Sequence, residues 1–135
     1  MTIRSLFPAL VFLAGPALAQ ASAAPLPALK PDQQAALHCS AVFARIAHER
    51  ADPAMAARLP DLGPRGSEYF ARIGARLMDD TGATRPQIAQ MFRGAVAEVD
   101  RTLEASPDHA AALRAAMVPC QTLLDFEVPP ERPAK

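Results

Sequence analysis

The chain has 135 residues, with 14 basic and 14 acidic side chains and no tryptophan. This balance of charge provides no basic surface of the kind that attracts nucleic acid or an anionic membrane, so neither is expected as a partner. Half of the residues are hydrophobic but only 5% are aromatic, and alanine dominates the apolar fraction. Such a composition favours closely packed helices over a sheet.

Residues 1–19 have the pattern of an export signal. Arg4 precedes an apolar stretch from Leu6 to Leu18 without an acidic residue, and Ala17-Leu18-Ala19 is a typical cleavage site. The alternative is a retained membrane anchor, but the stretch is shorter than the roughly 20 residues that span a bilayer. Cleavage is expected after Ala19 or Ala23, and the released protein is expected to be periplasmic or secreted.

Behind the signal, the chain divides into three parts. Residues 20–30 consist mainly of alanine and proline and are expected to form an extended, poorly ordered leader. Residues 31–127 are expected to form one helical domain. Residues 128–135 are again rich in proline and are expected to form a disordered tail.

The first part of the domain predicts three helices. One begins at Pro31-Asp32, where a proline suits the first turn, and runs to about Arg50. A short helix is expected over 53–59, after Asp52 as its cap. A third is expected from residue 65 or 66 to residue 80, with a glycine to end it.

Two further helices are expected in the second part. Thr84 and Gln87 have the spacing of a capping box, in which each side chain satisfies the other's backbone amide. The last helix opens at Ser106-Pro107-Asp108, and Pro119 inside it predicts a kink or a new helix start. The fourth helix has the clearest 3.6-residue repeat of the chain, carried by Ile88, Met91, Phe92, Ala95, Val96, Val99 and Leu103.

Cys39 and Cys120 are the only cysteines. In an exported chain an isolated pair predicts one disulfide, which here would join the first helix to the last. The alternative is a redox-active pair, but such sites use a Cys-x-x-Cys motif at a helix start, whereas these cysteines are far apart and flanked by apolar residues.

No motif in the chain predicts catalysis or a cofactor. There is no Gly-x-Ser-x-Gly turn, no phosphate-binding glycine loop and no Cys-x-x-Cys-His motif. The histidines, His38, His48 and His109, have no pair at the i, i+4 spacing of a helical metal site. We therefore expect no enzyme activity, no cofactor and no metal.

One segment is a candidate partner surface. A turn rich in proline and glycine precedes the only tyrosine of the chain, and arginines follow at helical spacing. The alternative is a helix start whose Tyr69 and Phe70 only anchor the core. The candidate surface, on which the arginines would meet carboxylates of a partner, consists of Arg65, Glu68, Tyr69, Arg72 and Arg76.

Taken together, the export signal, the alanine-rich body, the distant cysteine pair, the Gly63-Pro64-Arg65-Gly66 turn and the closing Pro119-Cys120 segment resemble small secreted all-helical proteins of Gram-negative bacteria. The resemblance covers Leu37 to Leu124. It implies no assigned function and supplies no catalytic residue.

We therefore expect an all-α protein, a small four-helix-type bundle with a short extra helix, clamped by one disulfide. In the periplasm it would act by binding, as a chaperone-like or interaction module whose partner is another periplasmic protein. The alternative is an inhibitor or immunity-type partner of a secreted enzyme.

Overall fold

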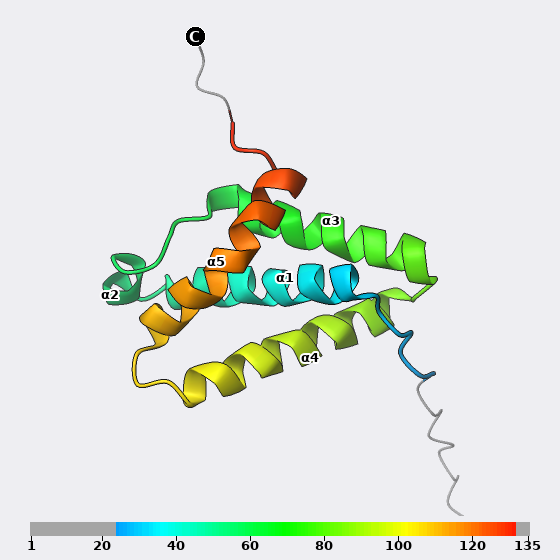
Figure 1. The fold of residues 1–135 in the computed structure, drawn as a ribbon, viewed down its shortest axis with the longest axis horizontal. Helices are drawn as coiled ribbons and strands as arrows, with labels where there is room; N and C mark the ends of the chain where they lie inside the picture. The colour runs from blue at the N-terminus through cyan, green and yellow to red at the C-terminus, as the bar shows by residue number, and fades with distance from the viewer. Residues whose placement is uncertain (1–23, 132–135) are drawn as a thin grey trace, which may run out of the picture.

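The computed structural model describes residues 24–131, which form five α-helices (Figure 1). They are α1 (Pro31–Glu49), α2 (Pro53–Ala56), α3 (Gly63–Thr81), α4 (Arg85–Glu104) and α5 (His109–Glu127). The predicted all-α class, with four main helices and one short helix, is confirmed. The predicted export signal and both cleavage sites lie outside the described residues.

Helix α1 is the centre of the bundle. In Figure 1 it runs between α3 and α4, and α5 crosses it; it contacts all three. Val42, Phe43 and Ile46 are at most 1% exposed. Burial on several sides agrees with the broad apolar face of this segment, because a helix that packs against one neighbour needs only a narrow stripe.

Local sequence signals set the helix ends. The backbone amide of Thr84 donates to Oε1 of Gln87 at 2.9 Å, and the amide of Gln87 lies 3.5 Å from Oγ1 of Thr84, which is the predicted capping box at the start of α4. Asp108 caps α5 by accepting from the amide of Ala111 at 3.0 Å. Gly82 ends α3 with φ of 70°, a left-handed conformation that glycine adopts without steric cost.

The short helix α2 ends at Ala56, earlier than expected. Pro60, four positions after Ala56, has no backbone N–H and so cannot donate to the Ala56 carbonyl in a longer helix. Nη1 of Arg50 donates to this carbonyl instead, at 2.8 Å, and to the carbonyl of Leu59 at 2.6 Å.

Of the two outcomes predicted at Pro119, a kink or a new helix start, the new helix start is wrong, because α5 continues through this residue. Proline leaves the carbonyl of the residue four positions earlier, Ala115, without its helical donor. Ala115 and Pro119 are both exposed, so water can bind the freed carbonyl and the helix need not end.

The ends of the described chain pack onto the bundle. Residues 24–30 have no regular secondary structure, and the carbonyl of Pro25 accepts from Nε2 of Gln87 on α4 at 3.3 Å. Beyond α5, Val128 is only 4% exposed and belongs to the core. Within residues 24–131, no helix is both long enough and apolar enough to cross a membrane.

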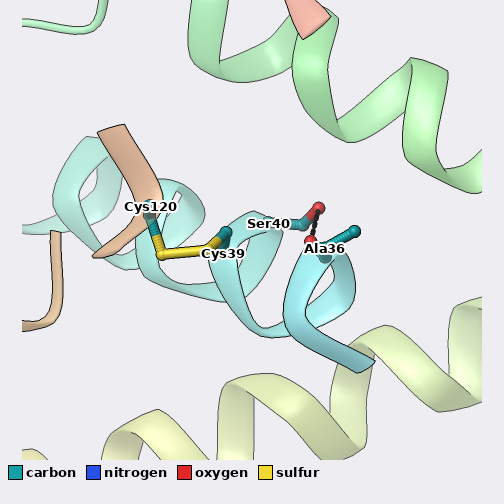
Figure 2. Close-up of a disulfide and its surroundings, with 4 residues drawn as sticks. All are labelled: Ala36, Cys39, Ser40 and Cys120. Atoms are coloured by element: carbon teal, nitrogen blue, oxygen red, sulfur yellow. Dashed lines mark hydrogen bonds between the residues drawn. A yellow bond between two sulfur atoms is a disulfide. The ribbon is translucent and has the colours of Figure 1, made fainter. Parts of the chain in front are cut away.

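The predicted disulfide is confirmed. Cys39 on α1 and Cys120 on α5, which are 81 positions apart in the sequence, are bonded, with their Cα atoms 5.4 Å apart (Figure 2). Both residues are buried, at 3% and 0% exposure. The neighbouring Ser40 is also buried, and its hydroxyl donates to the carbonyl of Ala36 at 3.0 Å, so it leaves no unsatisfied polar group beside the bridge.

We expect that replacing both cysteines, Cys39→Ala with Cys120→Ala, lowers the free energy of unfolding by roughly 4 to 5 kcal/mol, because the unfolded chain gains the entropy of an opened loop of this length. Thermal and denaturant melts followed by circular dichroism measure the change. The control is the helix content of the variant at low temperature, which should match the parent. Two reactive thiols in the purified, unreduced parent would contradict this expectation.

Candidate functional site

The predicted partner surface on α3 lies against the carboxyl end of α5. Arg65 donates from Nε and Nη2 to the carbonyl of Val128, at 2.9 and 2.7 Å, and from Nη2 to Oδ1 of Asp125 at 2.6 Å. The last carbonyls of a helix carry partial negative charge and lack helical donors, so a cation is stabilising there. Arg65 therefore caps α5.

The other two arginines of this predicted surface contact the same helix end. Arg72 donates from Nη1 to the carbonyl of Glu127 at 2.7 Å and pairs with Glu68 one turn earlier on α3. Arg76 pairs with the Glu127 carboxylate at 2.6 Å. The arginines do meet carboxylates, but those described here belong to the protein's own chain.

Tyr69, the remaining residue of the predicted surface, lies in the core. It is 1% exposed and packs edge-to-face on Phe43 of α1, with ring centroids 5.0 Å apart. Burial, aided by the negative charge of Glu127, raises the pKa of the phenol to about 12. The ring thus anchors α3 on α1, as the alternative interpretation of this segment expected.

Phe70 differs from its neighbour because it is 39% exposed. It stacks on Phe92 of α4 with ring centroids 4.0 Å apart. The pair lies in a groove between the outward sides of α3 and α4, of about 960 Å³, which we call the α3–α4 groove. Its residues are Phe70, Ala71, Gly74, Ala75 and Met78 of α3 with Arg85, Ile88, Ala89, Phe92, Arg93, Val96, Ala97 and Asp100 of α4.

The floor of the α3–α4 groove is apolar because α3 has more apolar positions than its core face uses. Ile73 and Leu77 point into the core, at 1% and 2% exposure, whereas Phe70, Gly74 and Met78 form a second line at i, i+4 and i+8. Gly74 packs under the Phe92 ring, and a Cβ there would make an ordinary van der Waals contact with it at 3.5 Å.

Charged residues of the groove differ in how they are paired. Nε of Arg45 lies 2.8 Å from Oδ1 of Asp100, so this carboxylate is neutralised by α1. Arg85 and Arg93 are exposed, and neither forms a hydrogen bond or an ion pair with any residue from 24 to 131. The two cations are therefore uncompensated within the described structure.

Sequence reasoning missed the α3–α4 groove, although one signal for it was present. The apolar residues of α3 span a sector wider than packing on one central helix needs, and they include both Phe70 and Met78. The facing residues of α4 carry no such signal, because Ala89 and Ala97 are equally common on solvated helix faces.

The potential metal ligands among the described side chains are dispersed. His38, His48 and His109 are exposed, and no three metal-binding side chains cluster within residues 24–131. The α3–α4 groove can exclude water from the apolar surface of a partner, and Arg85 and Arg93 can present their guanidinium groups to that partner.

No family model, curated protein or solved structure matches this chain.

Acid should weaken the hydrogen bonds and ion pairs that the carboxylates Asp108 and Asp125 form at the two ends of α5. A hydrogen bond from Arg65 lowers the pKa of Asp125, and the backbone amide of Ala111, with Arg58, lowers the pKa of Asp108. A carboxyl with a depressed pKa stabilises the fold above its ordinary value of 3.8, and this contribution is lost as pH falls through the lowered pKa. We expect the melting temperature to fall with pH in this range.

Hydrogen exchange at the two ends of α5 and thermal melts from neutral to acidic pH measure this loss. Asp125→Asn should make the melting temperature depend less steeply on acid. Asp79→Asn is the matched control, because Asp79 is an exposed aspartate that pairs with no described residue. Equal pH profiles for both variants would contradict the assignment.

Tyr69 is the only tyrosine, so the near-ultraviolet absorbance of the whole protein reports its ionisation. We expect a midpoint at about pH 12 for the folded protein and near 10.0 in denaturant. The stability contributed by the buried neutral phenol is fully present below 10.0 and is lost as pH rises through 12. A folded-state midpoint near 10 would show that the ring is solvated.

Proposed function

We propose that this protein is an exported helical binding protein that acts through contact and not through catalysis, with the α3–α4 groove as its docking surface. The observation that carries the proposal is the stacked pair Phe70 and Phe92, which leaves a large aromatic ring 39% exposed in an apolar groove. Contiguous apolar surface with charged residues at its rim is typical of interaction sites.

Two features support an oxidising compartment outside the cytosol. The first 19 residues carry the pattern of an export signal, and the Cys39–Cys120 bond would not persist in most reducing cytosols. A buried crosslink also suits a periplasmic binding module, because it keeps the groove-bearing helices on a core that resists unfolding in a changing environment.

The fold leaves the α3–α4 groove accessible. Its lining comes from α3 and α4 alone, while α5 is held on α1 by the disulfide. A partner could therefore dock without displacing any described helix, as in complexes whose backbones change little on binding.

Site-specific photo-crosslinking in the producing cell tests the proposal. A photoreactive amino acid in place of Ala75, an exposed groove residue, should give a discrete adduct with another exported protein. The same amino acid in place of Ala115, which is exposed on α5, is the matched control and should not. The adduct should disappear when Ala89→Trp fills the groove.

The identity of the adduct would separate a client of a chaperone-like module from a secreted enzyme under inhibition. Equal labelling from positions 75 and 115, or an adduct at 75 that survives Ala89→Trp, would contradict a docking role for the groove.

A further inference from the structure

We infer that the occupant of the α3–α4 groove is an amphipathic helix of another protein, bearing carboxylates that lie against Arg85 and Arg93. This inference rests on the proposed function and specifies the chemistry of its partner. It is argued from the shape of the groove, from the pairing of its charges and from the position of Arg85 on α4.

The shape fits a helix. The groove follows α4 from Arg85 to Asp100, about 22 Å at 1.5 Å per residue, and it is open to solvent along one side. A helix of about four turns would bury an apolar stripe against Phe70 and Phe92 and keep its polar side in water. An acyl chain in the same open groove would leave much of its own surface exposed.

Small side chains would allow that helix to approach closely. Ala71 and Ala75 of α3 and Ala89 and Ala97 of α4 all line the groove. Residues of this size let ridges of a third helix settle between the first two, whereas larger side chains would hold it away from the aromatic floor.

The arginines without a described partner indicate that the binding partner is negatively charged where it meets the groove. Every other arginine from residue 24 to residue 131 forms an ion pair or donates to a carbonyl of this chain: Arg45, Arg50, Arg58, Arg65, Arg72, Arg76, Arg101 and Arg114. Arg85 and Arg93 do neither with a described residue, and both line the groove. Interfaces place opposite charges against each other, so carboxylates are the expected complement.

The position of Arg85 strengthens this argument. It is the first residue of α4, where the helix dipole is positive, and no acidic residue lies in the first turn. A cation is unfavourable at this end of a helix. Among residues 24–131 nothing compensates this positive charge beside the apolar groove, and a carboxylate from a partner would do so.

A second copy of this chain fits the groove less well. Two-fold interfaces are self-complementary, so the same patch must supply both charges. The one acid of the groove, Asp100, is already paired with Arg45. Two copies meeting face to face would bring four unpaired arginines together without free carboxylates.

The spacing of the arginines predicts the partner's sequence pattern. Arg85 and Arg93 are eight residues apart on α4, about 12 Å along its axis. A helix lying along α4 would meet both with acidic residues seven or eight positions apart. Its apolar contacts would come from positions i, i+3, i+4 and i+7 between them.

A synthetic peptide tests the inference with the oxidised, processed chain, which retains all five helices. The probe is an 18-residue helix with a leucine stripe and two glutamates about two turns apart; a second peptide has lysines in their place. We expect the glutamate peptide to shift the amide resonances of α3 and α4, with weaker binding by the lysine peptide. Fluorescence anisotropy measures both dissociation constants.

Variants of the protein separate the contribution of the two arginines to peptide binding from that of the shape of the groove. Arg85→Gln with Arg93→Gln should weaken binding of the glutamate peptide about fivefold or more, since two partly exposed ion pairs are lost. Arg101→Gln is the matched control on the same helix, because Arg101 lies outside the groove and pairs with Glu98. Ala89→Trp should abolish binding, and Ala115→Trp should not. Circular dichroism checks that each variant is folded.

The outcomes distinguish this inference from the proposed function. Equal affinity for both peptides, blocked by Ala89→Trp, would overturn the acidic partner but keep the groove as a docking site. No binding, or binding that survives Ala89→Trp, would overturn both. Groove shifts with dodecanoate and not with the peptide would assign an anionic amphiphile instead and overturn the inference.

Measurements on the protein alone test two further occupants of the groove, a second copy of the chain and the chain's own apolar N-terminal segment. Concentration-dependent dimerisation that Ala89→Trp prevents would assign the groove to a second copy. Groove resonances that differ between the 135-residue chain and the processed chain would assign it to the apolar segment Leu6–Leu18. Either result would overturn the inference, and a monomer with identical resonances in both forms supports it.

Discussion

The covalent bond between Cys39 and Cys120 joins the helix at the centre of the bundle to the last helix of the chain. It lies near the middle of α5, and polar contacts hold that helix at both ends: Arg58 pairs with Asp108 at 2.6 Å, and Arg65 binds the carbonyl of Val128. Most of the stability of a helix in a protein comes from its tertiary contacts, so the position of α5 depends on these attachments.

The remaining helices are arranged by the burial of α1. Val42, Phe43 and Ile46 are shielded from water only if helices pack against α1 on more than one side. In the structure α3 and α4 flank α1, and α5 crosses it (Figure 1). The outward sides of α3 and α4 are then left without a described neighbour. The same packing that completes the core therefore creates the α3–α4 groove, with Phe70 as its most exposed aromatic ring.

Arginine has two distinct uses in this protein. Most arginines satisfy carbonyls or carboxylates of the chain, as Arg50 does behind α2 and Arg76 does at the end of α5. Such contacts replace part of the rigidity that a small core cannot supply, because a domain of this size buries a limited fraction of its surface. Arg85 and Arg93 form no such contact with any residue from 24 to 131, so within that range they do not contribute to this network.

The helices and the disulfide can be predicted from local patterns in the amino-acid sequence. Capping by Thr84 and Asp108 involves residues within three positions of each other, and a chain with two cysteines allows a single internal pairing. Local patterns do not predict that Arg65 and Arg76 contact α5, that α5 continues through Pro119, or that a groove forms beside Arg93. These features depend on side chains and solvent access brought together from distant parts of the chain, and helical periodicity does not specify which neighbour a face will meet.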